Sequence, residues 1–420
     1  MKVIQTKRSR IVNHETLIVT VDIGKIMNMG YWRTPNGTAE AKPFEFSNDS
    51  RGFNKLWNNI SEARKNFNLK EIVVGFESTG CYGEPLLHFL RKKKIIIVQV
   101  NPVHTKRLKE LQGNSPSKTD QKDPKVVADI IELGHALTTV IPEGSAAELR
   151  RLTHARERCL RRRTALLNQL QDLIFIVFPE FLGVMKNVKT KSSRYILTNI
   201  ASPQSIIEYG VENLSLQLKK TSRGQLGKER AEELNQAAWQ SVGIQEGQDS
   251  IFFEIRELIS LIEKSERFVV ELEIRMSEHL KHISYSKFIL SIKGIGEITA
   301  AGLIGEVGDF NKFSTVSELQ KLAGLDLFEI SSGKHQGKRR ISKRGRPLLR
   351  KLLYFAALSV IRKDGIFHDW YQSALERGMI KMKALVAVSR KLLGIIFALV
   401  RNQSLYVLDY ARTQALKAVA

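Results

Sequence analysis

Cysteine is scarce in this chain of 420 residues, long apolar runs are missing, and acidic residues are outnumbered by basic ones. Cys81 and Cys159 are too few for a zinc knuckle or a disulfide framework, which fits a reducing compartment. No segment reaches the roughly 18 to 20 apolar residues of a membrane-spanning helix, and the longest apolar run lies only between Lys391 and Arg401. The basic amino terminus lacks the apolar segment of a signal peptide. We therefore expect a cytoplasmic protein with no membrane partner.

Positive charge is what the sequence has in excess. The 66 Lys and Arg residues exceed the 43 Asp and Glu residues, which gives a formal net charge of +23. A charge of this size favours polyanionic partners, nucleic acid first, with a basic protein of the membrane surface as the alternative.

The first part of the chain alternates short apolar runs with helical patterns. Strands are predicted over 16–23, 28–32, 43–46, 71–76 and 95–100, and helices over 51–67, 84–93, 102–111 and 126–133. The first strands would form a meander, and the later strands would be joined by helices. This order predicts a mixed α/β sheet of the ribonuclease H-like kind over residues 16–144, preceded by a basic tail over residues 1–15.

Strand patterns stop near residue 145. Apolar residues at helical spacing then run to Pro179, and again from Ile251 to about His282, which predicts two long helices that can pair as a coiled coil. The polar stretch 182–247 between them predicts an irregular helical insertion, so that 145–285 forms one region. Arginines crowd the first helix, and those predicted to bind nucleic acid are Arg150, Arg151, Arg161 and Arg162.

A third region is predicted over residues 286–402, followed by a tail over 403–420. It opens with Gly294-Ile295-Gly296 between two short helical patterns, which is typical of a helix-hairpin-helix. Glycines in such a turn let backbone amides approach a phosphate, although they could equally serve only to make a tight turn.

The most basic run of the chain follows, over residues 331–346. Seven of these sixteen residues are cationic, namely Lys334, Lys338, Arg339, Arg340, Lys343, Arg344 and Arg346. We predict a flexible loop that lies against a phosphate backbone, with a solvated basic surface as the alternative. A hydroxyl nucleophile in this loop, such as Ser331 or Ser332, would benefit from cations that stabilise a phosphoryl transition state.

Four acidic residues are candidates for a metal site. Asp22 and Glu77 end strand-like runs, whereas Asp120 and Asp123 lie three residues apart at a helix start and would share a helix face. Carboxylates of this kind suit two Mg²⁺ ions, or Mn²⁺, bound to a phosphodiester. Asp123 could instead be a helix cap before Pro124, and Asp129 is a further candidate ligand or a solvated helix residue.

These motifs resemble the DEDD transposases of bacterial insertion sequences, the insertion-sequence family one-hundred-and-ten. The amino-terminal resemblance, over about residues 15 to 140, is carried by Val21-Asp22-Ile23-Gly24-Lys25, Gly75-Phe76-Glu77-Ser78-Thr79-Gly80 and Lys118-Thr119-Asp120-Gln121-Lys122-Asp123. The carboxy-terminal one, over about 286 to 400, is carried by Gly294-Ile295-Gly296, Leu322-Ala323-Gly324-Leu325, Ser331-Ser332-Gly333 and Arg340-Ile341-Ser342-Lys343-Arg344-Gly345. Pro124, where members usually have a small residue, and the absence of a His in 26–29 depart from the pattern.

The resemblance implies a RuvC-like catalytic domain whose Asp-Glu-Asp-Asp set is Asp22, Glu77, Asp120 and Asp123. It implies a serine nucleophile, Ser332 in preference to Ser331, that forms a covalent bond to DNA. It further implies donor and target DNA as substrates, a structured non-coding guide RNA and a homo-oligomer, dimer to tetramer, whose subunits share active sites. The expected setting is the bacterial or archaeal cytoplasm, at the nucleoid.

Three other classes stay open on the residues alone. A junction-resolving, structure-specific endonuclease would use the four acids and leave the carboxy-terminal region as a clamp. A non-catalytic nucleic-acid-binding scaffold would explain the charge but not the acids. An actin-like kinase also opens with Val-Asp-Ile-Gly, but the later glycine-rich phosphate-binding segments that it needs are not evident.

Overall fold

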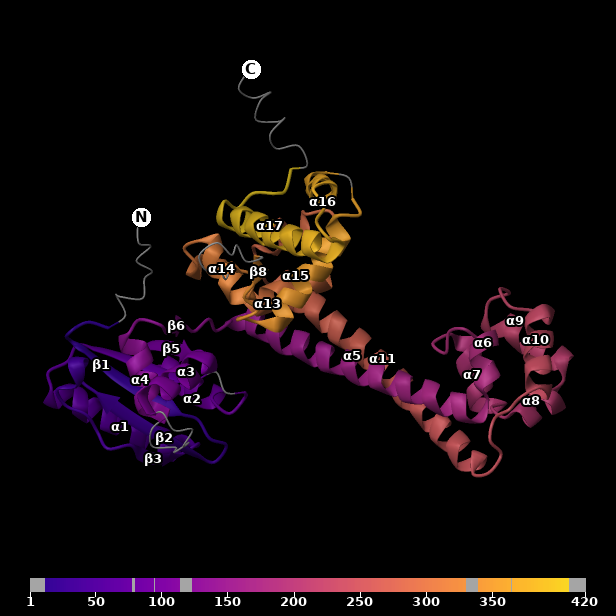
Figure 1. Ribbon diagram of the computed structural model, residues 1–420, viewed down its shortest axis with the longest axis horizontal. Coiled ribbons are helices and arrows are strands. Elements are labelled where there is room, and N and C mark those ends of the chain that lie inside the picture. Colours follow the sequence, from indigo (N-terminus) through magenta and orange to yellow (C-terminus); the bar gives the residue numbers. More distant parts are fainter. Residues whose placement is uncertain are drawn as a thin grey trace, which may run out of the picture. The chain divides into compact units, whose positions relative to one another are not determined.

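The computed structural model describes residues 12–77, 80–93, 95–113, 123–329, 339–363 and 365–407. The chain forms two compact units, divided between Val140 and Ile141. Figure 1 shows a sheet with its helices in the first unit and helices almost throughout the second. In the described ranges, no helix is long and apolar enough to cross a membrane.

A six-stranded mixed sheet forms the first unit, with the strand order β3-β2-β1-β4-β5-β6. The strands β1 (Thr16–Asp22), β2 (Met27–Arg33) and β3 (Phe44–Ser47) form an antiparallel meander. Next to β1 lie β4 (Glu71–Glu77) and β5 (Ile96–Val100), both parallel to it. The two-residue strand β6 (Leu137–Thr138) pairs antiparallel with β5. The predicted mixed α/β sheet is confirmed, whereas β6 was not predicted because two residues show no periodicity.

Helices cover both faces of this sheet. Leu17, Val19 and Val21 of β1 point to the face that α1 (Ser50–Asn66) and α2 (Glu84–Arg91) cover. Ile18 points to the opposite face, which α4 (Asp123–Glu132) covers together with α3 (Pro102–Gly113). Successive side chains of a strand alternate between faces, so a strand buried on both sides reads as one continuous apolar run. This is the physical reason why β1 was recognisable in the sequence. A short turn of 3-10 helix, η2 (Pro35–Gly37), follows β2.

Two helices of 34 residues each, α5 (Gly144–Val177) and α11 (Gln248–Lys281), form the axis of the second unit. They run antiparallel: Arg156 bonds to Glu273 near one end of the pair, and Gln169 bonds to Glu254 nearer the other. Both helices were predicted from their apolar spacing.

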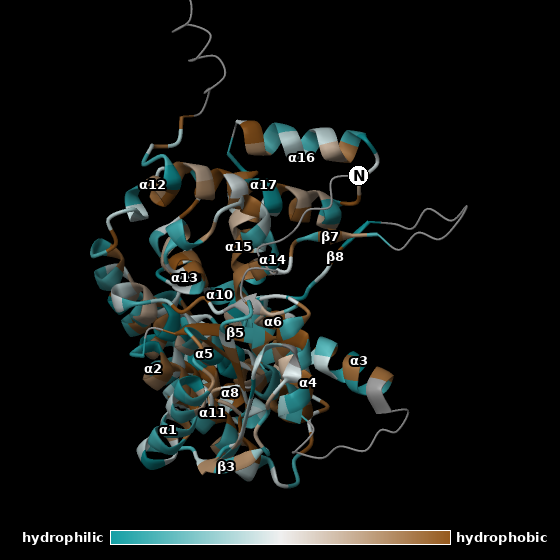
Figure 2. Ribbon diagram, turned by 90° about the vertical axis from the view of Figure 1, so that its left-hand side faces the viewer, coloured by the Kyte–Doolittle hydropathy of each residue, from teal (hydrophilic) through white to brown (hydrophobic). Residues whose placement is uncertain are grey.

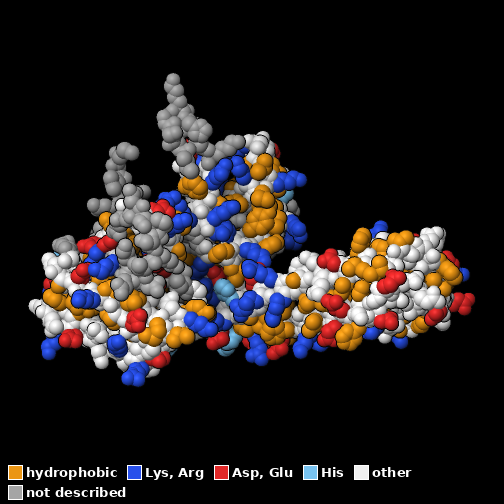
Figure 3. Space-filling view, turned by 60° about the horizontal axis from the view of Figure 1, so that its bottom comes forward, with side chains coloured by type: hydrophobic (Ala, Val, Ile, Leu, Met, Phe, Trp, Pro, Cys, Tyr) orange, Lys and Arg blue, Asp and Glu red, His pale blue; other side chains and the backbone are white. Residues whose placement is uncertain are grey.

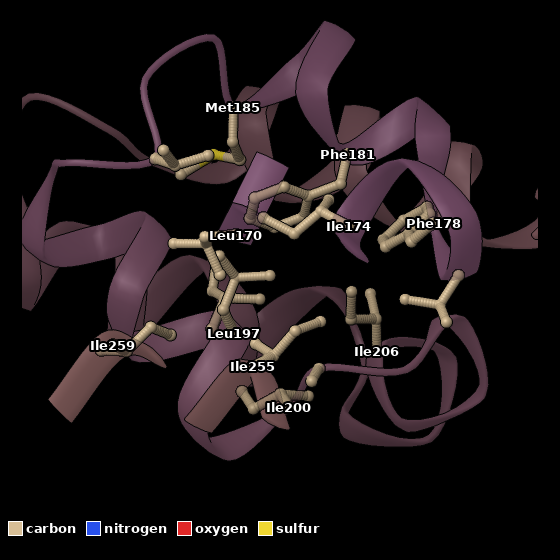
Figure 4. Packing of buried hydrophobic residues seen from close by; sticks show 14 of the residues in the cluster. Leu170, Ile174, Phe178, Phe181, Met185, Leu197, Ile200, Ile206, Ile255 and Ile259 are labelled. Carbon is tan, nitrogen blue, oxygen red and sulfur yellow. The ribbon is translucent and has the colours of Figure 1, made fainter. Parts of the chain in front are cut away.

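The segment between these helices is more regular than predicted. It folds as α6 (Pro179–Val184), α7 (Lys191–Asn199), α8 (Pro203–Tyr209), α9 (Val211–Thr221) and α10 (Lys228–Trp239). Figure 4 shows Phe178, Phe181 and Ile206 in one core with Ile174 of α5 and Ile255 of α11. The sequence did not predict these separate helices, because each helix is short and forms a hydrophobic core only together with its neighbours.

The rest of the second unit is a helical body, which we call the carboxy-terminal body (Figure 2). Its elements are α12 (Ser286–Leu290), α13 (Glu297–Val307), η3 (Phe310–Lys312), α14 (Val316–Ala323), β7 (Leu327–Phe328), β8 (Arg340–Ile341), α15 (Pro347–Val360), α16 (Ile366–Glu376) and α17 (Lys381–Arg401). The basic run predicted as a loop is in part a strand, because β8 pairs antiparallel with β7. Two-residue strands escape periodicity analysis, and α16 was also not predicted.

Candidate functional site

Asp22 and Glu77 lie at the same edge of the sheet. The parallel register of β1 and β4 ends with Val21 beside Phe76, and the two acids take the next position on each strand. Adjacent strands lie about 4.8 Å apart, so the two backbones that carry these acids are close neighbours. Both side chains are half-buried. The sheet thus brings together two carboxylates that are separated by the whole of β2, β3 and α1 in sequence.

The start of α4 is fixed at this edge as well. The hydroxyl of Thr20, two residues before Asp22, donates a buried hydrogen bond of 2.7 Å to the carbonyl oxygen of Pro124. Gly75 permits the close packing of α4 on β4, because a Cβ atom there would lie 2.2 Å from Cδ1 of Ile131. These contacts hold Asp123, the first residue of α4, near the carboxyl end of β1.

Asp123 makes an ion pair with α3. Its Oδ1 atom lies 2.5 Å from Nζ of Lys109, and the Asp123 side chain is only 14% exposed. The contact is ionic without hydrogen-bonding geometry, so this buried oxygen keeps an unused acceptor capacity. Lys109 was not singled out in the sequence, and only the packing of α3 on α4 could identify it.

Asp129 has a different role from the candidate ligands. Its Oδ1 atom accepts a hydrogen bond of 2.6 Å from Nη1 of Arg33 on β2, and Arg33 also pairs with Glu132. Burial alone would lower the pKa of Arg33, but its bonds to these two carboxylates raise the pKa overall. The arrangement ties α4 to the meander, which accounts for Asp129 as a structural residue.

The donor chemistry at the edge suits a hard divalent ion. Asp22, Glu77 and Asp123 offer carboxylate oxygens, the donors that Mg²⁺ and Mn²⁺ prefer. Within the described ranges, no three His, Cys, Asp or Glu side chains gather closely enough to hold a metal ion. Asp120 lies outside these ranges. The unused acceptor of Asp123 fits a role as a ligand.

The β7–β8 hairpin carries the predicted nucleophile. Ser331, Ser332, Gly333, Lys334 and Lys338 lie outside the described residues. The two ends of their segment are held together, since Nε of Arg339 lies 2.9 Å from Oε2 of Glu329. The amide nitrogen of Ser342 donates a hydrogen bond of 2.9 Å to the carbonyl oxygen of Asp326. Four described cations of the basic run 331–346 are exposed, namely Arg339, Arg340, Lys343 and Arg344.

Two of the predicted nucleic-acid contacts are engaged inside the protein. Glu306 of α13 is 1% exposed and lies 2.9 Å from Nη1 of Arg150 and 2.8 Å from Nε2 of His154. Arg346 donates to the backbone carbonyl of Glu306. Burial, with the charge of Arg150 added, lowers the pKa of Arg346 to about 10. A single carboxylate in the otherwise apolar run 300–307 was the signal for this cluster in the sequence.

The other predicted contacts differ in their surroundings. Arg151, Arg161 and Arg162 are exposed on α5, and Arg161 pairs with Glu157 at 2.9 Å. Gly294 has a left-handed φ of +103°, and a Cβ atom there would lie 3.1 Å from the carbonyl oxygen of Ser359. Packing thus explains Gly294. Gly296, which precedes α13, is exposed with open space around its α-carbon.

Comparisons with known proteins match both regions that carry these residues. The model described as "Transposase IS116/IS110/IS902 family" matches residues 286–372, and a model of the DEDD transposase of IS110 matches residues 19–179. The insertion element IS116 uncharacterized 44.8 kDa protein of Streptomyces clavuligerus is 24% identical over 69% of this chain and 72% of its own length. The insertion element IS900 uncharacterized 42 kDa protein of Mycobacterium paratuberculosis is 24% identical over 69% of this chain and 73% of its own length. The transposase for insertion sequence element IS1111A of Coxiella burnetii is 35% identical over 28% of this chain and 33% of its own length.

The two models match in the order in which the sheet and the carboxy-terminal body occur in the chain. The relatives are proteins of insertion elements, which agrees with the resemblance inferred from the motifs. This chain belongs to the IS110/IS116/IS902 family of DEDD transposases.

Proposed function

We propose that this transposase cuts and rejoins DNA by a metal-dependent phosphoryl transfer with a serine nucleophile. The observation that supports this proposal most is the convergence of Asp22, Glu77 and the start of α4 at one edge of the sheet. Carboxylate residues from distant parts of the sequence have little reason to be placed at one edge of a sheet for stability alone, since like charges repel.

In the proposed site, Asp22, Glu77, Asp120 and Asp123 hold Mg²⁺ or Mn²⁺. A bound divalent ion polarises a phosphodiester and stabilises the charge that develops on its oxygens. Lys109 orients the Asp123 carboxylate, because its ammonium group lies 2.5 Å from Oδ1. The Thr20 hydroxyl orients the first turn of α4 through Pro124.

Ser332, with Ser331 as the alternative, supplies the nucleophile. Its oxygen attacks the phosphorus atom and forms a serine-phosphate ester, while the bond from phosphorus to one deoxyribose oxygen breaks and that oxygen takes up a proton. Rejoining is the reverse step with another strand, so the energy of the phosphodiester is kept in the ester. The exposed cations Arg339, Arg340, Lys343 and Arg344 bind the phosphates on either side.

The finer parts of the proposal concern partners. A structured guide RNA from the element would pair with donor and target DNA, and the net charge of +23 suits a protein that binds both nucleic acids.

The α5–α11 pair would act as a coiled coil between subunits. Exposed apolar side chains on α11 support this oligomer, namely Phe253, Val270 and Ile274 at 67%, 55% and 55% exposure. The turn at Gly296 would bind phosphate as part of a helix-hairpin-helix.

The test is covalent capture. The purified protein is incubated with DNA of the element's ends, the element's RNA and Mg²⁺, and protein-DNA adducts are resolved on denaturing gels. We expect an adduct with wild type and with Ser331→Ala, and none with Ser332→Ala. Asp22→Asn and Glu77→Gln should reduce adduct formation by at least about a hundredfold, as loss of charge stabilisation at a reacting phosphate does.

Each other outcome has a meaning. An undiminished adduct with Ser332→Ala moves the nucleophile to Ser331. Metal-dependent nicking without any adduct favours the junction-resolving endonuclease, and retained cleavage by Asp22→Asn contradicts the carboxylate site. Omitting the RNA tests guidance separately from chemistry, because unguided cleavage would lose sequence selection only.

A further inference from the structure

The carboxy-terminal body contains an apolar pocket next to the β7–β8 hairpin. Its lining includes Arg350, Lys351 and Tyr354 of α15, Met382 and Val386 of α17, and Leu325 and Ile341. Its volume is about 240 Å³, which is below the roughly 300 to 1,000 Å³ of sites for drug-sized ligands. A single flat ring system is the kind of ligand that suits this size.

Two cations, Arg350 and Lys351, line the pocket, and further basic residues precede them in the sequence. Residues 339–351 hold seven Lys or Arg residues and no carboxylate. Arg350 is held in place by its 2.9 Å bond to the carbonyl oxygen of Ala323. Lys351 and Arg161 share the single carboxylate of Glu157, at distances of 2.7 and 2.9 Å, which leaves one positive charge uncompensated. An apolar pocket with cations in its lining matches a ligand that has an aromatic part and a negatively charged part.

Exposed apolar groups point to a ligand that covers the pocket. Met382 is 65% exposed, and Ile380, just before α17, is 64% exposed. Tyr354 is half-buried, and the ring of its neighbour Phe355 lies edge-on to it at a centroid distance of 5.9 Å. Such a contact fixes the tyrosine ring. Figure 3 shows hydrophobic side chains beside Lys and Arg side chains on the surface of the second unit.

We propose that this pocket receives one unpaired nucleobase, stacked on Tyr354, of the strand whose phosphates the basic hairpin binds. The inference rests on the proposed function, because it takes nucleic acid as the ligand. Every nucleobase has an aromatic face, so stacking tolerates any sequence, and the phosphates on either side of the base supply the negative charge for Arg350 and the hairpin cations. An unpaired base occurs where a strand is displaced or where a junction opens, which are the states that strand exchange passes through.

The experiment measures binding and photochemical cross-linking of the full-length protein. Oligonucleotides with 5-iodouracil at successive positions are used as single-stranded DNA, as single-stranded RNA and, for comparison, as blunt duplex DNA. We expect a cross-link to Tyr354 with one or both single-stranded probes and none with the duplex. The DNA and RNA arms decide which nucleic acid supplies the base.

Variants isolate the stacking contact. Tyr354→Ala should weaken single-strand binding about tenfold and duplex binding less than about twofold, whereas Tyr354→Phe should keep single-strand binding within about twofold. Val386→Phe fills the pocket and should weaken single-strand binding like Tyr354→Ala. Tyr371→Ala is the matched control, since this tyrosine of α16 is half-buried, as Tyr354 is, and does not line the pocket.

The idea is overturned if Tyr354→Ala and Val386→Phe behave like Tyr371→Ala, or if cross-links map outside the residues that line the pocket. Unchanged binding by all variants would mean that a protein segment fills the pocket. These outcomes differ from failure of the proposed function, in which the wild-type protein forms no serine-DNA adduct whether or not it binds a base.

Discussion

At the scale of single residues, Glu306 is the least exposed charged side chain among the described residues of the second unit. Its carboxylate is 1% exposed, and Arg150 and His154 contact it directly. Burial by itself would raise its pKa, but the hydrogen bond from His154 and the positive charges of Arg150 and Arg346 lower the pKa overall. The folded state therefore stabilises the ionised form of this residue.

Replacing Glu306 by Gln should destabilise the second unit by about 3 kcal/mol, because the cations around it lose their buried partner. Urea denaturation, followed by circular dichroism, measures this change. The control is Glu273→Gln, whose pair with Arg156 is about 30% exposed on both sides (28% and 32%) and should matter by less than about 1 kcal/mol. Equal effects of the two variants would contradict the special role of Glu306.

The same carboxylate predicts a dependence on pH. A group whose pKa is lower in the folded than in the unfolded state stabilises the fold fully above its unfolded value, about 4.3 for Glu. This contribution is lost as the pH falls through the lower, folded pKa. The difference in unfolding free energy between wild type and Glu306→Gln should thus be constant near pH 7 and shrink below about pH 4. Denaturation at several pH values checks it, and a difference that grows in acid would refute the assignment.

At the scale of elements, close helix packing fixes the carboxy-terminal body to α5. Gly305 of α13 approaches the backbone of α5 so closely that a Cβ atom would lie 2.6 Å from the amide nitrogen of Arg150. Gly302, one turn earlier, has a similar approach to Leu352 of α15. Backbone atoms cannot rotate away as a side chain can, so α13 must shift if Gly305 is enlarged, whereas the end of the Leu352 side chain can move away from Gly302.

Gly305→Ala should therefore lower stability by about 1 to 3 kcal/mol, the usual cost of overpacking, despite the better helix propensity of alanine. Gly183→Ala in α6 is the matched control. Nothing lies within 4 Å of its added methyl group, so the change should be neutral or stabilising by up to about 1 kcal/mol. Thermal denaturation compares the two variants. A stabilising Gly305→Ala would mean that α13 and α5 are not in close contact.

At the scale of the whole molecule, the chemistry is divided between two compact units. Asp22, Glu77 and Asp123 belong to the first unit, and the β7–β8 hairpin belongs to the second. Neither unit contains both a carboxylate set and the serine segment.

The charge of the whole molecule predicts steeply salt-dependent binding. If about six to ten phosphates are contacted, affinity for DNA should fall about 10³- to 10⁵-fold between 50 and 200 mM salt. Arg340→Gln combined with Arg344→Gln should lower the slope of log affinity against log salt by about 2. The control, Lys219→Gln with Lys220→Gln at the exposed end of α9, removes the same charge and should leave the slope unchanged. Equal slopes for both pairs would show that net charge alone governs binding.

Several elements were predictable because their physics is local. The strand β1 was recognisable since both of its faces are buried, and α5 and α11 were recognisable since a long helix repeats its apolar spacing many times. The strands β6, β7 and β8 were not, because two-residue strands exist only through their partners. The insertion of α6 to α10 was underestimated for the same reason, since its core is shared among seven helices and is not periodic in any one of them.

By itself, the sequence determined the basic character of the protein, the strands that end in Asp22 and Glu77, the long helices and the family, because composition, periodicity and motif spacing are properties of the chain. Tertiary structure alone decided which charges are available. It paired Asp129 with Arg33 and Lys109 with Asp123, and it buried Arg346 beside Glu306. It also brought Tyr354 and Val386 into the lining of one pocket. Such pairings depend on packing between distant segments, which no local pattern of residues encodes.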